Sequence, residues 1–362
     1  DLPSNPPIYL WCPLQQQWPF SPPYSPAIKR DIMFQQILNK QPIMIYSSFI
    51  FSLLFFCSCG EESTDIIGGS DDGTTNPSSC INAYPTDTSR GDCTETLAYT
   101  NTYNETITTR NRIISGNSIP NHQVGRFGSG NGSLNPNAIS EQSVSYTITT
   151  APSRAVSLTP LQDGGPPQYS FGVLLNGVEL DPIAAEPFPH EGMFSTNANW
   201  DWNLEALNVR IGLDCNNAHV QPTGKYHYHG TPTLYLDEIN ASTNAMTLIG
   251  YAADGFPIYY KYAYADATDA NSSIVAMRSS YQLKTGERPG DGVTAPCGEY
   301  NGAYSADYEY ISGLGTLDEA NGRTGVTPEY PAGTYYYVLT DEFPAIPRYF
   351  VGIPSDDFLL GR

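Results

Sequence analysis

Hydrophobic and polar residues alternate along much of the chain after about Asn101, which is the pattern of half-buried β-strands. In "SVSYTITT", residues 143–150, β-branched and aromatic residues recur at every second position. In "FGVLLNGVEL", residues 171–180, the pair Asn176-Gly177 separates two apolar runs and favours a tight hairpin turn. These segments predict strands joined by short turns.

Further strands are expected at residues 226–229, 233–236, 247–252, 258–262 and 334–339. One short helix is predicted over residues 199–210, where tryptophan and leucine side chains can form one apolar face. No internal repeat or heptad pattern is visible in the sequence. The pattern therefore predicts a mainly β protein with one large, sandwich-like domain at residues 100–362 and few short helices.

A hydrophobic run, "IYSSFIFSLLFF", occupies residues 45–56. It is shorter than the ~20 residues that a membrane-spanning helix needs, but it is typical of the centre of a signal peptide. In "FFCSCGEES", the small Ser58 precedes Cys59, which is similar to the lipobox of bacterial lipoproteins except that Phe56 replaces the usual Leu. We predict a signal peptide at residues 33–58, a lipid on Cys59, and a location in the cell envelope, anchored to a membrane outside the cytoplasm. Cleavage without a lipid is the alternative.

The segments on either side of this signal are not expected to fold. Residues 1–32 precede the signal, are rich in proline and lack an initiating methionine, so we exclude them as an upstream segment. Residues 59–99 begin with a polar stretch rich in Gly, Ser and Asp, which predicts a flexible tether.

Seven cysteines occur in the chain. Those that follow the predicted lipidation site are Cys80, Cys93, Cys215 and Cys297. An exported protein can oxidise them, and their spacing lacks the paired C-x-x-C of a zinc ribbon, so we predict disulfides. Four cysteines permit three connectivities; a Cys80–Cys93 bridge would close a short loop that joins the tether to the domain.

The chain is acidic, with 37 acidic and 17 basic residues and a formal charge of −20. Because no cluster of lysine or arginine interrupts this background, we predict that the protein does not bind nucleic acid. The acidic surface suits an exported protein that meets divalent cations, or it serves only to keep the protein soluble.

The stretch "HVQPTGKYHYH" contains three of the five histidines: His219, His227 and His229. On a strand, His227 and His229 point to one side and the intervening tyrosines to the other. The turn signal "QPTG" can fold His219 back beside them. Since catalytic zinc sites use three protein ligands and keep a fourth position open, we predict a transition-metal site for zinc or copper. The alternative is that these histidines only hydrogen-bond or stack in a polar core.

Other residues are candidates for a role beside the metal. Asp254, in an Asp-Gly turn, can hydrogen-bond to a ligand histidine, be a fourth metal ligand or act as a general base, or it simply caps its turn. Glu329 is a second candidate general base. His122 and His190 lie in turn-rich segments and can join the site or belong to the surface.

Oxygen donors at Asp318, Glu319 and Asn321 make calcium a further candidate ion, although their spacing differs from an EF-hand loop. Arg323 and Arg348 can bind an anionic substrate or form structural ion pairs, and the acidic composition favours the ion pairs.

Several ordered motifs identify the chain as similar to a known family. The segments "NAHVQPTGKYHYHGTP", "LIGYAADGFPIYY" and "TPEYPAGTYYYVLT" resemble the YHYH-domain proteins, which are named for the tetrapeptide that begins here at Tyr226. The resemblance covers roughly residues 101–348 and implies an exported, often lipid-anchored protein. It does not imply a particular reaction. In relatives a cysteine often stands where this chain has Ala320 and would be the partner of Cys297; its absence here leaves a Cys215–Cys297 bridge as an option.

Two functions are consistent with these observations. The first is a lipid-anchored protein whose histidines bind a transition metal, with hydrolysis of an unidentified small-molecule substrate if a coordination position stays open. The second is a non-catalytic cell-surface module that binds a glycan or a protein through its tyrosine-rich surface.

Overall fold

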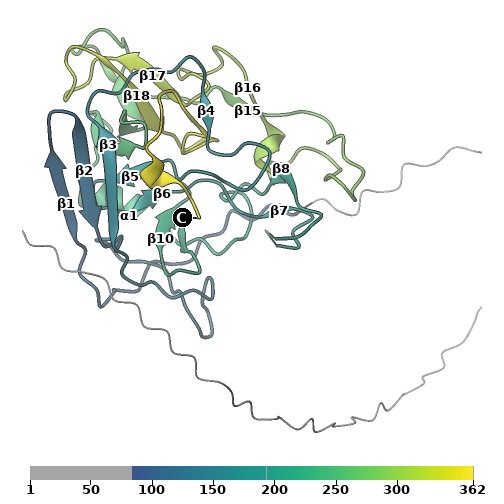
Figure 1. Ribbon diagram of the computed structural model, residues 1–362. Coiled ribbons are helices and arrows are strands. Elements are labelled where there is room, and N and C mark those ends of the chain that lie inside the picture. The colour runs from purple at the N-terminus through teal and green to yellow at the C-terminus, as the bar shows by residue number, and fades with distance from the viewer. Residues whose placement is uncertain (1–83, 193, 362) are drawn as a thin grey trace, which may run out of the picture. The chain divides into compact units, whose positions relative to one another are not determined.

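The computed structural model describes residues 84–361 except residue 193, and these residues form a mainly β fold, as predicted (Figure 1). Its helical elements within this range are short: α1 (Thr233–Glu238) and the 3-10 turns η1 (Ser305–Asp307) and η2 (Asp356–Phe358). In the described part of the chain, no helix is long and apolar enough to cross a membrane.

The largest sheet has eight strands in the order β17-β18-β12-β11-β5-β6-β10-β9. Its strands are β5 (Gly172–Leu174), β6 (Glu179–Leu180), β9 (Ala218–Val220), β10 (Tyr226–Tyr228), β11 (Thr247–Ala252), β12 (Pro257–Tyr260), β17 (Gly322–Gly325) and β18 (Thr334–Leu339). Most neighbours are antiparallel, but β6 with β10 and β12 with β18 are parallel pairs. The sheet therefore ends at β9, an edge strand.

A second sheet of three antiparallel strands packs against the first and shares its hydrophobic core. Its strands are β1 (Tyr103–Ile107), β2 (Asn111–Gly116) and β3 (Val144–Thr149), and Figure 1 shows them as a separate layer beside the large sheet. The Arg112 guanidinium lies 3.7 Å from the centre of the Tyr251 ring of β11, and the Tyr146 hydroxyl of β3 donates to Glu179 of β6. These contacts give the predicted sandwich-like arrangement.

Short strand pairs complete the described fold. They are β4 (Thr159–Pro160) with β19 (Tyr349–Phe350), β7 (Pro187–Phe188) with β8 (Asn199–Asn203), β13 (Tyr262–Tyr264) with β14 (Ile274–Ala276), and β15 (Tyr281–Leu283) with β16 (Tyr308–Tyr310).

Most of the predicted strands are confirmed within a residue or two, because alternation along a strand is a local property. They are β3, the β5–β6 hairpin, β10, β11, β12 and β18. The predicted strand at 233–236 is wrong: this segment is α1, where the backbone N–H of Leu236 donates to the Pro232 carbonyl. The Asn216 side chain accepts a hydrogen bond from the Leu234 N–H at 2.9 Å, so a residue outside the segment stabilises its first turn.

The predicted helix at 199–210 is also wrong. Its first residues form β8, which pairs with β7, and Trp202 packs edge-on against Tyr304 with ring centroids 5.7 Å apart. A strand partner and an aromatic neighbour from elsewhere in the chain therefore override a short amphipathic pattern.

The predicted Cys80–Cys93 disulfide, at the end of the predicted tether at 59–99, needs correction. Within the part that the structure describes, Gly91 forms a β-bridge with Asp214, and Cys93 is bonded to Cys215 across 122 residues. The Cys80–Cys93 and Cys215–Cys297 pairings are therefore wrong, because both would need a cysteine already used. Cys297 is also disulfide-bonded. The calls on Cys59, Cys80 and the segments 1–32 and 33–58 fall outside the described residues.

Candidate metal centre

The three predicted histidines meet at the edge of the eight-stranded sheet. His219 of β9 and His227 of β10 are cross-strand partners in an antiparallel pair. His229 lies two residues beyond His227 on the same side. Its Nε2 is 3.0 Å from Nε2 of His227 and 3.1 Å from Nε2 of His219. The three candidate ligand atoms all lie within 4.8 Å of one another, so the group can hold a metal ion.

The other ring nitrogens determine which atom of each ring can coordinate. Nδ1 of His219 lies 3.2 Å from the Ile211 carbonyl, and Nδ1 of His227 lies 3.3 Å from the Lys225 carbonyl. Because a carbonyl only accepts, each Nδ1 must donate, and we assign the lone pair of each neutral ring to Nε2. A proton on Nε2 of His229 could bond to only one of the two nitrogens that face it. The cluster therefore has more acceptors than donors.

Burial keeps these rings neutral. His227 and His229 are each 2% exposed, whereas His219 is partly exposed at the sheet edge. Desolvation lowers the pKa of His219, and it lowers the pKa of His227 and His229 well below the ordinary range, with mutual repulsion in the charged state as a further cause. Neutral imidazole is the form that ligates a metal.

The spacing also fits a metal of ordinary coordination geometry. Zinc–nitrogen bonds of about 2.0–2.1 Å at a tetrahedral angle place two ligand nitrogens about 3.3 Å apart. The observed 3.0 and 3.1 Å separations need only a small opening to reach that value. Within the described residues, Nδ1 of His229 has no partner in normal hydrogen-bond geometry. The Pro182 backbone nevertheless opposes the fall in the pKa of His229.

The tyrosines of the same strand anchor it from the opposite side. The Tyr226 hydroxyl donates to Asp214 at 2.8 Å. The Tyr228 hydroxyl lies 2.6 Å from Nε2 of His122 and accepts from the Asn176 side chain at 3.1 Å. Both rings are fully buried, so their hydroxyls need these partners. The alternation Tyr-His-Tyr-His thus separates a buried anchor from a candidate ligand set.

The turn between β9 and β10 requires glycine. Gly224 has φ +86°, and a Cβ there would lie 2.0 Å from the Ser140 hydroxyl. Its backbone N–H donates to the Gln221 carbonyl at 2.8 Å, which closes the turn. This local geometry returns His219 to the side of His227.

The N-terminal segment fixes the loop that precedes His219. Besides the Cys93–Cys215 disulfide, Nε of Arg90 donates to the Asn217 side chain at 2.6 Å. The Asn217 carbonyl in turn accepts from the His229 backbone N–H at 2.7 Å. Arg90 was not predicted as part of the site, and no local pattern around it indicates this role.

A family comparison covers the segment that contains the three histidines. The sequence model described as "YHYH protein" matches residues 145–352, more than half of the chain, and includes all three histidines. The chain belongs to the YHYH protein family. No curated protein and no solved structure matches it significantly.

The structure does not bring the predicted general bases to the histidines of this YHYH protein. Asp254 lies in the β11–β12 turn, and β11 is three strand positions from β10, about 14 Å at ~4.8 Å per strand. Its carboxylate accepts from the Tyr337 hydroxyl at 2.5 Å and the Gly352 N–H at 2.9 Å. Glu329 accepts from the Tyr259 hydroxyl of β12 at 2.6 Å, farther along the sheet. Both carboxylates satisfy buried tyrosines.

Two carboxylates that the sequence analysis did not single out lie beside the histidines. Glu179 of β6 is the parallel partner of His227, and Asp181 lies two residues further along. Glu179 pairs with Lys225, whereas Asp181 Oδ1 is buried and has no partner in the described part of the chain. Desolvation, together with the charge of Glu179, raises the pKa of Asp181 to about 7. The parallel β6–β10 pairing, which joins segments far apart in sequence, creates this neighbourhood.

The remaining candidates have structural partners elsewhere. His190 lies 3.1 Å from the Tyr304 hydroxyl, outside the histidine cluster. Oδ1 of Asp318 accepts from the N–H groups of Ala320 and Gly322, so it caps a turn. Among the described residues, Asp318 and Glu319 belong to no cluster of potential metal ligands. Arg323 donates to Tyr336 and to the Tyr264 carbonyl, as a structural residue would.

Proposed function

We propose that this YHYH protein binds a divalent transition metal, zinc or copper, through Nε2 of His219, His227 and His229. The observation that supports this most strongly is the convergence of three neutral imidazoles at separations of 3.0 and 3.1 Å in a buried place. A proton on Nε2 of His229 satisfies only one of the two lone pairs that face it, whereas a metal ion can bind all three nitrogens. Desolvation opposes further protonation of these rings.

The ligand set favours a reactive site over a closed structural one. Three protein ligands leave a fourth position free, and a metal there supplies Lewis acidity and makes a bound water more acidic. Partly exposed His219 on the edge strand offers a route from solvent. Asp181, whose buried Oδ1 has no partner among the described residues, is our candidate to accept a proton in a hydrolytic step, in place of Asp254 and Glu329.

We further propose that the folded domain is attached to a membrane outside the cytoplasm by a lipid on Cys59. The sequence around this cysteine supports the proposal. A disulfide between Cys93 and Cys215 is compatible with an oxidising compartment. Metabolic labelling with a palmitate analogue tests the anchor, with a Cys59→Ser variant as the control that should lose the label.

Metal binding is tested by titrating purified metal-free protein with Zn²⁺ and Cu²⁺ in a calorimeter. We expect one ion per chain for the unaltered protein and loss of binding in the His227→Gln/His229→Gln double variant. The matched control is His190→Gln, which removes a histidine outside the cluster. Affinity should fall as the pH drops, because protons compete for the nitrogens that ligate the metal.

Two outcomes would contradict the proposal. The first is the absence of stoichiometric binding at neutral pH. The second is equal binding by the double variant and by His190→Gln. Either result would favour the non-catalytic module instead.

A further inference from the structure

A cavity of about 250 Å³ is lined in part by Arg348, whose charge acts on His229. Residues that line it include Ile183, Tyr281, Tyr308, Phe343, Arg348 and Tyr349. We propose that this cavity binds a small carboxylate with a planar, apolar body, and that Arg348 recognises the carboxylate. This inference rests on the proposed metal site in one respect only, which is the effect of the metal on affinity.

Arg348 has donors that the described residues do not satisfy. Its Nη2 donates to both carboxylate oxygens of Glu205, at 2.9 Å each. The Arg348 side chain is only 10% exposed. Its Nε and Nη1 are buried and have no acceptor in the described part of the chain. A buried N–H without an acceptor is costly, so an acceptor supplied by a ligand fits this place.

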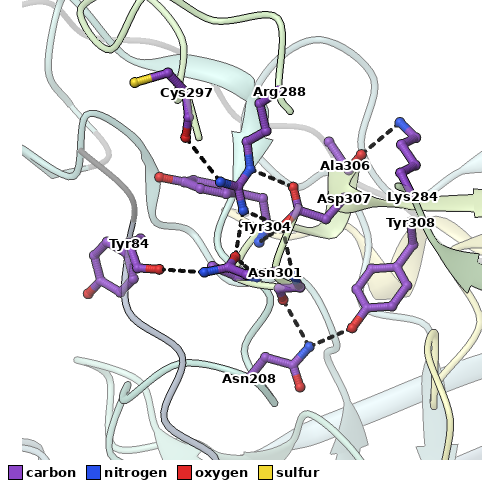
Figure 2. A network of polar contacts seen from close by, with 12 residues as sticks. Tyr84, Asn208, Lys284, Arg288, Cys297, Asn301, Tyr304, Ala306, Asp307 and Tyr308 are labelled. Carbon is purple, nitrogen blue, oxygen red and sulfur yellow. Dashed lines mark hydrogen bonds and ion pairs between the residues drawn. The ribbon is translucent and has the colours of Figure 1, made fainter. Parts of the chain in front are cut away.

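Another buried arginine shows what full pairing looks like. Arg288 donates from Nε and Nη2 to Asp307 and from Nη1 to the Cys297 carbonyl, and Nη2 also reaches Asn301 (Figure 2). All three of its nitrogens have acceptors. The free nitrogens of Arg348 are therefore a property of its site and not of buried arginines in this fold.

The cavity lining favours an anionic ligand over a cationic one. No Asp or Glu is among its lining residues, whereas a guanidinium is. Glu205 accepts hydrogen bonds from that guanidinium. Glu205 also accepts a hydrogen bond from the Ser305 hydroxyl at 2.8 Å. Guanidinium–carboxylate bonds are among the stronger hydrogen bonds in proteins because both partners are charged.

The aromatic walls fit a flat apolar body. Tyr308 and Phe343 stack with ring centroids 4.0 Å apart and planes at 4°, and Tyr281 meets Phe343 edge-on at 5.4 Å. The hydroxyl groups of two of these rings already have hydrogen-bond partners: the Tyr308 hydroxyl accepts from Asn208, and the Tyr281 hydroxyl donates to the Glu319 carbonyl. Ring surfaces of this kind pack well against another ring.

The cavity is linked to the metal centre through the chain and through charge. Ile183 follows Pro182, whose backbone influences His229, and the Arg348 charge also acts on His229. Around both sites, Arg348 and Lys225 carry positive charge, and the carboxylates that carry negative charge are Glu179, Asp181 and Glu205. A divalent ion would make this local balance two charges more positive. Metal loading should therefore strengthen carboxylate binding.

Calorimetry with benzoate and its neutral analogue benzamide tests the proposal on the full chain, with and without Zn²⁺. We expect benzoate to bind at least tenfold more tightly than benzamide and several-fold more tightly after Zn²⁺ loading. Arg348→Lys should lower benzoate affinity at least tenfold. The matched control Arg323→Lys, at an arginine bonded to Tyr336 and the Tyr264 carbonyl, should leave it unchanged.

Arg348→Lys can also disturb Glu205, so its folding is checked by circular dichroism. Phe343→Leu provides a second variant, which should weaken benzoate binding several-fold and leave acetate binding unchanged. Equal binding of benzoate and benzamide, or no binding of either, would overturn the proposal. Zn²⁺ binding measured in the same samples separates the two ideas: intact metal binding without benzoate binding refutes only the cavity proposal.

Discussion

Two buried polar clusters in this protein have opposite hydrogen-bond balances. Around Arg288 and Asp307, both fully buried, donors and acceptors match: Asp307 also accepts from the N–H groups of Gly302 and Tyr304 (Figure 2). In the histidine cluster, Nε2 atoms face one another, and among the described residues Nδ1 of His229 has no partner in normal hydrogen-bond geometry. Burial is similar in the two places, so the difference lies in chemistry.

This difference separates a structural network from a candidate functional one. A satisfied buried ion pair stabilises the loops around it, and removal of one partner leaves an isolated charge. A cluster of facing acceptors contributes little until a cation arrives, because its groups are desolvated without compensation. The unsatisfied atoms therefore mark where a ligand is needed.

The largest expected effect concerns the satisfied cluster. Asp307→Ala should lower the free energy of unfolding by about 3–5 kcal/mol, because it leaves the Arg288 charge buried and unpaired. Urea denaturation of the metal-free protein measures the change. The exposed pair of Arg278 and Glu342 is the control, and Glu342→Gln should cost about 0–1 kcal/mol. Similar costs for the two variants would contradict the comparison.

The next effect concerns the histidine cluster, where a substitution is not expected to lower the free energy of unfolding of the metal-free protein. In metal-free protein, His227→Leu should change the free energy of unfolding little or increase it, because it removes a desolvated acceptor. Zn²⁺ at 100 times its dissociation constant should stabilise the unaltered protein by about 2.7 kcal/mol, and His227→Leu should lose this gain. Thermal unfolding with and without Zn²⁺ measures both. A metal-free cost as large as that of Asp307→Ala would show that the histidines are structural.

A smaller effect is expected at Asp181. In the folded state the pKa of Asp181 is about 7, above the ordinary 3.8. Ionisation of Asp181 therefore lowers the free energy of unfolding at high pH and has no such effect at low pH. The penalty grows as the pH rises from about 4 and is complete above about 7. Asp181→Asn should therefore raise the free energy of unfolding of metal-free protein by about 2 kcal/mol at pH 8, roughly half of the ~4 kcal/mol that three pKa units represent, because a buried Asn amide also loses solvation. The effect at pH 4 should be much smaller. Denaturant melts at both pH values test this, and an equal effect at both would be inconsistent with a raised pKa.

The smallest effect is expected on the tyrosine side of β10. Tyr228→Phe removes a hydroxyl bonded to His122 and Asn176 and should cost about 1 kcal/mol. Because the strand loses part of its anchor, Zn²⁺ affinity should fall a few-fold, which calorimetry measures. Tyr310→Phe in β16 is the control, since that ring lies outside this network. An unchanged affinity in Tyr228→Phe would mean that the anchor does not position the histidines.

Local sequence patterns determined much of the fold and the core of the candidate site. Side chains alternate across a strand with period two, so β3, β11 and β18 could be predicted from residues inside each segment. The same alternation predicted that His227 and His229 share one side, and the glycine turn predicted the return of His219. These conclusions depend only on neighbouring residues and on backbone geometry.

Tertiary structure alone decided the partners that lie far away in sequence. The Cys93–Cys215 bond spans 122 residues, and the Arg348–Glu205 pair spans 143. The Asp181 N–H donates to the Tyr228 carbonyl of β10 only because β6 and β10 are parallel neighbours. No local periodicity encodes such contacts, since they depend on how the whole chain packs into one core. The sequence thus determined which side chains can act together on one strand, and packing decided which charges surround them.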